Sequence, residues 1–142
     1  MQSIYQSAER VIAGQDTAFI GSVNEDGYPT IKAMLPPRLR EGLKFFYFST
    51  NTSSTRAAHF IKNEKACVYF ADRQLFRGVM LLGKMEVLQD MHHKQLLWQD
   101  GDTLYYPLGA TDPDYCALRF TALSGRYYQD FKSVNFSIEG GA

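Results

Sequence analysis

The sequence predicts a mainly β (α+β) fold: a six- to seven-stranded antiparallel β-barrel with two or three flanking helices, in one domain spanning residues 1–142. Its 142 residues suit a single domain. Short strand-like segments follow one another through short turns, which favours a closed or half-open barrel over a doubly wound sheet. Gly83 interrupts a long strand-like run, and we expect a bend or bulge there, as a barrel corner requires.

The N-terminal elements are a helix and a hairpin. Apolar residues recur on one face of a helix from Ser3 to Ala13. A strand is predicted for Thr17 to Val23, and the turn residues Asp26-Gly27 lead into a return strand from Thr30 to Leu35. Two prolines then end the strand, because proline cannot donate to a ladder.

The remaining elements alternate between strands, turns and two further helices. We expect a turn (Arg38 to Gly42), a strand (Leu43 to Thr50) and a helix (Arg56 to Asn63). Two strands follow, Ala66 to Ala71 and the long run from Arg77 to Leu88, and then a second helix from its cap Asp90 to Trp98. A loop (Gly101 to Asp114) leads to a final hairpin of Tyr115 to Leu123 with Gly125 to Tyr128. The tail after Phe131 gives no clear pattern.

The composition narrows the classes of partner. Fifteen basic and fifteen acidic residues give a formal charge of zero, so long-range attraction to nucleic acid or anionic lipid is weak. We expect no nucleic acid or membrane partner and, without a signal-like or membrane-spanning segment, a cytoplasmic location. Cys67 and Cys116 are predicted to be reduced, buried thiols. The three histidines have no ligand-like spacing and no serine has a plausible histidine and acid partner, so we expect neither a metal site nor a catalytic triad.

The junction from Ser49 to Arg56 is the most informative segment. A strand ends there, six of the seven residues from Ser49 to Thr55 carry hydroxyls, and a helix begins with an arginine in its first turn. A helix N-terminus has free backbone N–H groups and a positive dipole end, so this junction is a candidate phosphate site. Simple N-capping by serine or threonine is the plainer interpretation, although one cap does not require so many hydroxyls.

Lys32 is a second candidate. Alternation places it on one face of the return strand with Thr30 and Met34. A lysine there either is solvated or projects into a half-buried site, where it can pair with an anion.

Three segments in order resemble the pyridoxamine 5′-phosphate oxidase superfamily, above all its general stress protein 26-like branch. They are Thr17 to Met34 with its Asp26-Gly27-Tyr28-Pro29 turn, Phe46 to Phe70, and Arg77 to Leu88. The resemblance covers most of the chain. It implies a split β-barrel and a homodimer that holds FMN, the flavin cofactor, at the subunit interface, together with a small-molecule substrate.

The resemblance also implies cofactor contacts. Lys32 takes the place of a basic residue near the flavin, and the backbone of Ala33 and Met34 passes beside the ring. Ser49 and Thr50 match contacts at the end of the third strand of the family fold, while Ser54, Thr55 and Arg56 match its phosphate-binding cluster.

Departures from the family argue against a vitamin B6 oxidase. Thr55 stands where the full-length oxidases have an arginine, Pro37 where they have a lysine, and Gly78 where they have a flavin-contacting glutamine. Those oxidases hold pyridoxal phosphate with an arginine and a histidine two residues later, whereas Arg126 is followed by two tyrosines. The expected function is therefore an FMN-dependent oxidoreductase acting on an unknown small molecule. The alternatives are a non-catalytic flavin-binding or stress-response module, and a barrel that binds another cofactor such as haem or a deazaflavin.

Overall fold

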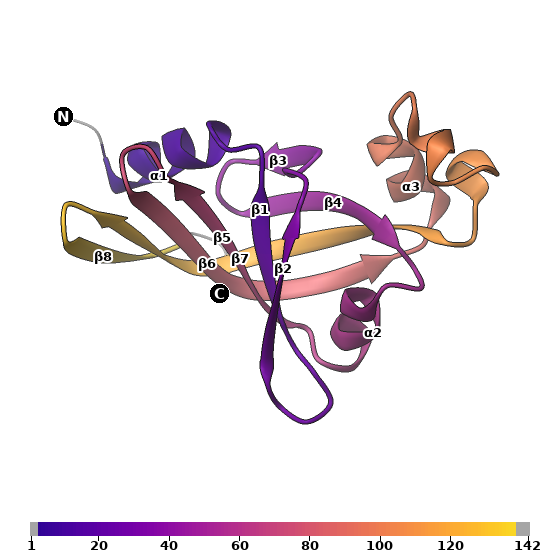
Figure 1. The fold of residues 1–142 in the computed structure, drawn as a ribbon, viewed down its shortest axis with the longest axis horizontal. Helices are drawn as coiled ribbons and strands as arrows, with labels where there is room; N and C mark the ends of the chain where they lie inside the picture. Colours follow the sequence, from indigo (N-terminus) through magenta and orange to yellow (C-terminus); the bar gives the residue numbers. More distant parts are fainter. Residues whose placement is uncertain (1–2, 139–142) are drawn as a thin grey trace.

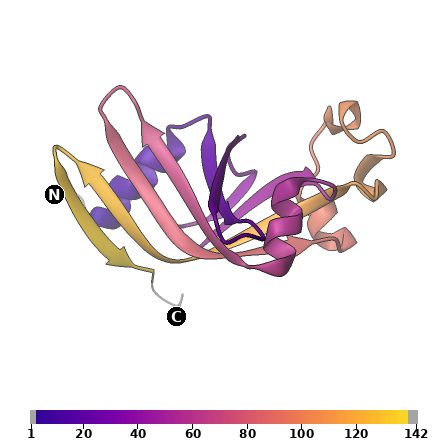
Figure 2. The ribbon, with the colours of Figure 1, turned by 60° about the horizontal axis from the view of Figure 1, so that its bottom comes forward.

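The computed structural model describes residues 3–138, and these form one strongly curved antiparallel sheet with three α-helices around it (Figures 1 and 2). In chain order the helices and strands are α1 (Ile4–Ala13), β1 (Ala18–Val23), β2 (Pro29–Met34), β3 (Leu39–Glu41), β4 (Phe45–Asn51), α2 (Thr55–Lys62), β5 (Lys65–Asp72), β6 (Arg77–Leu88), α3 (Met91–Leu97), the 3₁₀ turns η1 (Asp102–Leu104) and η2 (Gly109–Thr111), β7 (Tyr115–Gln129) and β8 (Lys132–Ser137).

The sheet is open rather than closed. Its strand order is β2-β1-β5-β6-β7-β4-β3, and β8 pairs with the C-terminal part of β7. The curvature brings β2 and the β3–β4 pair, which are the two ends of this order, round to the same side of the molecule (Figure 1). The predicted split-barrel fold class is confirmed.

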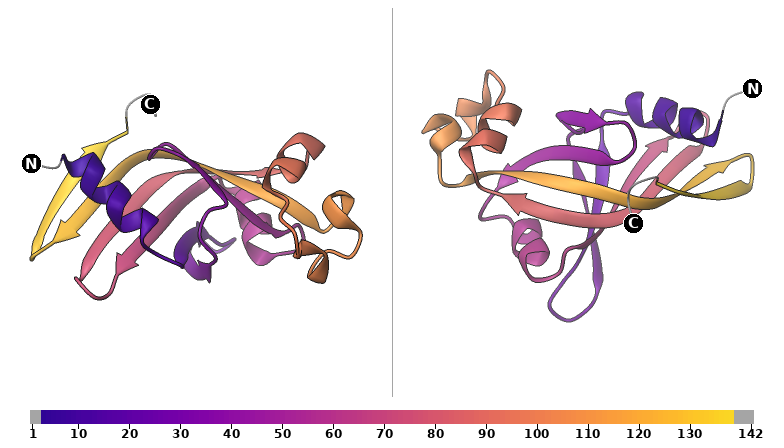
Figure 3. Two further views of the ribbon diagram at one scale, coloured as in Figure 1. Left: turned by 90° about the horizontal axis from the view of Figure 1, so that it is seen from above. Right: turned by 180° about the vertical axis from the view of Figure 1, so that it is seen from behind.

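Aromatic and aliphatic side chains fill the inner face of the sheet. Phe46, Phe48, Phe70 and Phe120 are almost fully buried in this core. Helix α1 lies at one end of the sheet (Figure 3, left) and contributes a buried face of Ala8, Val11 and Ile12. Its start is fixed by a capping box between Ser3 and Gln6, so the sequence-predicted helix is confirmed.

A separate lobe lies at the opposite end of the molecule. It comprises residues 91–114 and contains α3, η1 and η2 (Figure 3, right). Asp90 caps α3 through the backbone N–H of His93, as the sequence predicts. The lobe packs on the outer side of β4 and β7, where Tyr47, Leu97 and Ala117 form a small second core.

The predicted bulge at Gly83 is confirmed. The register between β6 and β7 shifts between Leu82 and Gly83. A Cβ atom at residue 83 would lie 2.0 Å from the carbonyl oxygen of Thr121, so only glycine permits the two backbones to approach this closely.

The predicted turn from Arg38 to Gly42 is too long. Gly42 has a φ of 56°, which glycine adopts without strain. The resulting turn is tight, so the residues before it, Leu39–Glu41, pair with β4 as a short strand.

The predicted final hairpin is also wrong. Residues 115–129 form one continuous strand, and the chain turns at Asp130 and Phe131, both of which have positive φ. Gly125 lies inside this strand, and its lack of a side chain makes room for Phe136 of β8. A Cβ atom at residue 125 would lie 2.4 Å from the Phe136 ring. The added strands β3 and β8 raise the number of strands among the described residues to eight.

Candidate cofactor site

The hydroxyl-rich junction connects the end of β4 to the start of α2. The Ser54 hydroxyl accepts a hydrogen bond from the backbone N–H of Ala57 at 3.1 Å, so Ser54 is the N-cap of α2. Its own O–H remains able to donate, and the first-turn amides of Thr55 and Arg56 have no acceptor within the helix. Capping and anion binding are therefore compatible at this junction.

Lys32 lies on the inner face at the edge of the sheet. In register it stands beside Ile20 of β1, which pairs with Val68 of β5 and, through it, with Leu81 of β6. These three neighbours are fully buried, so the Lys32 row is the core row of the sheet. Because β2 is the edge strand, Lys32 itself is exposed in the single chain.

A partly buried hydrogen-bond chain joins β2 to α2. The Ser22 hydroxyl of β1 lies 2.8 Å from the Thr30 hydroxyl of β2 and 2.8 Å from Nδ1 of His59. Thr30 precedes Lys32 on the same face by two residues, about 7 Å along a strand. Arg56 lies one turn before His59, so its side chain leaves α2 on a similar side. The chain therefore connects β2, two residues from Lys32, to α2, one turn after Arg56.

The Ser22–His59 pair was missed by sequence reasoning. The two residues are far apart in the chain, and only the packing of α2 under β1 brings them together. Ser22 is 3% exposed, so no substrate can reach its hydroxyl. The pair is therefore a structural link rather than a catalytic one.

The remaining predicted residues do not all point the same way. Met34 packs against the main core, and Thr50 continues the inner-facing series of Phe46 and Phe48 on β4. Ser49 and Ala33 face the other way. The Ser49 hydroxyl is buried without a hydrogen-bond partner among the described residues, on the side of β4 that carries the lobe. Only backbone atoms of Ser49 and Ala33 are available to the inner face.

Arg56 is half-buried, and no carboxylate in residues 3–138 forms an ion pair with it. By contrast Lys62, the last residue of the same helix, is paired with Glu25 of the β1–β2 turn. The Arg56 guanidinium therefore keeps its donors for another partner, which an anionic group would supply.

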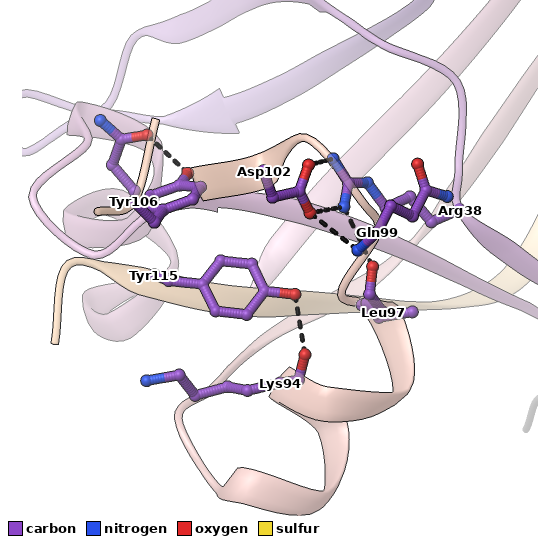
Figure 4. A network of polar contacts seen from close by, with 8 residues as sticks. Arg38, Lys94, Leu97, Gln99, Asp102, Tyr106 and Tyr115 are labelled. Atoms are coloured by element: carbon purple, nitrogen blue, oxygen red, sulfur yellow. Dashed lines mark hydrogen bonds and ion pairs between the residues drawn. The ribbon is translucent and has the colours of Figure 1, made fainter. Parts of the chain in front are cut away.

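A polar network ties the lobe to the sheet beside this junction (Figure 4). The Arg38 guanidinium makes a two-pronged ion pair with Asp102 and donates to the carbonyl of Leu97 at 3.0 Å. The pairing holds the pKa of Asp102 below its ordinary value. The Tyr106 hydroxyl donates to Oδ1 of Asn51 at 3.0 Å.

The aromatic residues of the lobe are divided between packing and exposure. Trp98 lies against Tyr106 and Tyr115 with ring centroids 6.4 and 5.2 Å away, so it packs within the lobe. Burial raises the pKa of Tyr106 to about 12, so it stays protonated as a donor at neutral pH. Tyr105 is 71% exposed.

The two cysteines are both free thiols: Cys116 is fully buried and Cys67 is half-buried. Burial raises the pKa of each thiol. Within residues 3–138, histidine, cysteine, aspartate and glutamate side chains form no group of three that could hold a metal ion. In the same part of the chain, no helix has the length and apolar composition needed to cross a membrane.

Comparison with known proteins identifies the fold and the family. The profile of the pyridoxamine 5′-phosphate oxidase family matches residues 5–129. The chain belongs to this family. A crystal structure of a protein from Clostridium acetobutylicum, described as related to general stress protein 26 of B. subtilis and to the pyridoxinephosphate oxidase family, is 42% identical. It superimposes with a TM-score of 0.85, covering 97% of this chain and 96% of the other.

More distant structures share the fold. General stress protein 26 from Bacillus anthracis is 18% identical with a TM-score of 0.75, covering 95% of this chain and 100% of the other. A haem-binding protein from Mycobacterium smegmatis is 12% identical with a TM-score of 0.77, covering 96% of this chain and 59% of the other. No curated protein matches the sequence. The general stress protein 26-like branch expected from the sequence is confirmed.

The residues at the junction fit an FMN phosphate in chemical type. A phosphate monoester carries up to two negative charges and several acceptor oxygens, and it needs donors and positive charge around it. Ser54, Thr55 and the α2 amides are donors, and Arg56 supplies a charge with no carboxylate paired to it. Thr55 adds no charge, so this cluster is less basic than one that keeps an arginine there.

Proposed function

We propose that this protein binds FMN between the start of α2 and the inner face of β2, and acts in the cytoplasm as an FMN-dependent oxidoreductase on a small molecule. The observation that carries the proposal is the unpaired, half-buried Arg56 at a capped helix start, on the same side of α2 as the link to β2. Family membership adds independent support.

Each residue then has a defined task. Arg56, Ser54 and Thr55 bind the phosphate, and Lys32 places its ammonium beside the edge of the flavin ring that becomes negative on reduction. Thr50 and the backbones of Ser49, Ala33 and Met34 line the ring. Bound FMN supplies the redox chemistry, while the protein binds, orients and electrostatically tunes it.

The outer face of the sheet supports a homodimer with the cofactor at the subunit interface. Two neighbouring rows cross β2, β1, β5 and β6 on this face, and they consist largely of apolar or aromatic residues: Ile31, Gly21, Cys67 and Leu82, then Ala33, Phe19, Tyr69 and Met80. Ile31 is 69% exposed and Leu82 is 45% exposed. A contiguous apolar face of this kind is typical of a surface covered by a partner. Since Ala33 belongs to it, the face borders the proposed flavin site.

Haem is the second candidate ligand, because a haem-binding protein shares the fold. A non-catalytic flavin-binding role is the second candidate activity. The absorbance spectrum separates haem from flavin, and turnover with a reduced nicotinamide donor separates an enzyme from a binding module.

The phosphate role is tested by replacing Arg56. Loss of a charge-assisted hydrogen bond costs about 1.5–3 kcal/mol, so Arg56→Ala should raise the dissociation constant of FMN about tenfold or more. Flavin fluorescence quenching gives this constant. Lys62→Ala, on the same helix but paired with Glu25, is the control and should bind as the wild type does. An unchanged FMN affinity in Arg56→Ala would remove the phosphate role.

A further inference from the structure

Asp114 accepts hydrogen bonds from the loop that leads into the proposed phosphate site. It is the last residue before β7, and its backbone carbonyl accepts a hydrogen bond from the N–H of Thr52 at 2.7 Å. Its side-chain Oδ1 accepts a second from the N–H of Ser53 at 2.9 Å. These two amides immediately precede Ser54, the cap of α2. One residue therefore fixes the backbone that leads into the helix start.

Asp114 is itself held by a buried polar relay. Its N–H donates to Oδ1 of Asp112 at 3.0 Å, and the other carboxylate oxygen of Asp112 accepts from Leu108. The Lys94 ammonium donates to the Asp112 carbonyl at 3.0 Å. Lys94 and Asp112 are 5% and 7% exposed. Because buried polar groups resist displacement from their partners, the relay anchors Asp114 to α3.

The charge of Asp114 is unfavourable for anion binding. A carboxylate near an expected phosphate repels it, so electrostatics does not account for an aspartate at this place. Its hydrogen bond to Ser53 does, because the carboxylate satisfies an amide of a loop that no strand pairs with beyond Asn51. The hydrogen bond to Ser53, rather than the charge of Asp114, therefore explains why an aspartate stands at this position.

We propose that Asp114 is a positioning residue of the cofactor site: it locks the residue 52–54 loop so that the Ser54 hydroxyl and the α2 amides face the phosphate. This inference rests on the proposed function. It extends the site to the lobe, whose sequence from Asp112 to Asp114 lies about sixty residues from the phosphate cluster.

Three variants separate position from charge. Asp114→Ala removes the acceptor and the charge, Asp114→Asn keeps an acceptor oxygen and removes only the charge, and Asp100→Ala is the control on an exposed site of the same lobe. Dissociation constants are measured for FMN and for riboflavin, which lacks the phosphate. Amide hydrogen exchange at Ser53 reports on the loop without any ligand.

Asp114→Ala should weaken FMN binding about three- to tenfold, the range of one hydrogen bond, leave riboflavin binding unchanged, and speed exchange at Ser53. Asp114→Asn should bind FMN at least as tightly as the wild type. Equal losses for FMN and riboflavin, an unchanged Asp114→Ala, or an Asp114→Asn as weak as Asp114→Ala would each overturn the positioning role alone. A wild-type protein that binds no FMN would overturn the proposed function and this inference with it.

Discussion

At the scale of single residues, Gly83 decides how closely β6 can approach β7. Because the atom that a Cβ would meet is the Thr121 carbonyl oxygen, 2.0 Å away, the strain cannot be relieved by rotating a side chain. Gly83→Ala should destabilise the fold by about 3 kcal/mol, the upper end of the usual cost of overpacking. Urea unfolding measures this. Gly14→Ala is the control, since a Cβ there meets nothing closer than 3.5 Å; equal stability of the two variants would contradict the argument.

The sequence predicts the role of Gly83 but not that of Gly125. A glycine can mark a turn, a bulge or a close contact, and the local pattern alone does not distinguish them. The contact of Gly125 is with Phe136, in a segment whose strand character the sequence does not reveal. The side-chain direction of Ser49 could be obtained from alternation along β4, but the lobe that covers it could not.

At the scale of elements, the ion pair of Arg38 and Asp102 fastens the lobe to the sheet. Arg38 holds the pKa of Asp102 below its ordinary value, so the folded state binds that proton more weakly than the unfolded chain. The pair therefore stabilises the docked lobe above the unfolded pKa of about 4, and this contribution is lost as the pH falls through the lower folded value.

Asp102→Asn should consequently destabilise the lobe at pH 7 and have little effect near pH 2. Removing one partner of a largely buried pair costs about 3 kcal/mol. Trp98, the only tryptophan and part of the lobe, reports the transition by its fluorescence. Thermal midpoints that differ by the same amount at both pH values would rule out the pair as the source of the pH dependence.

Most elements follow from the sequence because their signals are local. Capping residues, periodicity and proline place α1, α3 and the β1–β2 hairpin correctly. The short strand β3 and the strand β8 were not predicted, because neither has a clear strand pattern of its own. Strand β3 forms because the tight turn at Gly42 pairs it with β4, and β8 forms by pairing with the C-terminal part of β7. The link from Thr30 of β2 through Ser22 to His59 of α2 depends in the same way on tertiary packing.

At the scale of the whole molecule, the apolar outer face predicts self-association. Ile31→Asp places a charge on this face and should convert a dimer into monomers, because an unpaired charge is costly to bury. Sedimentation velocity gives the mass. Leu75→Asp, at the exposed β5–β6 turn, is the matched control and should stay dimeric. A dimer unaffected by Ile31→Asp would place the interface elsewhere.

The central claim is that the junction of β4 and α2 holds the phosphate of FMN, and a titration of the metal-free, ligand-free wild-type protein with FMN tests it most directly. We expect saturable binding of one FMN per chain, with flavin absorbance bands and no haem band, and clearly weaker binding of riboflavin. Absence of FMN binding, or equal affinities for FMN and riboflavin, would contradict the account.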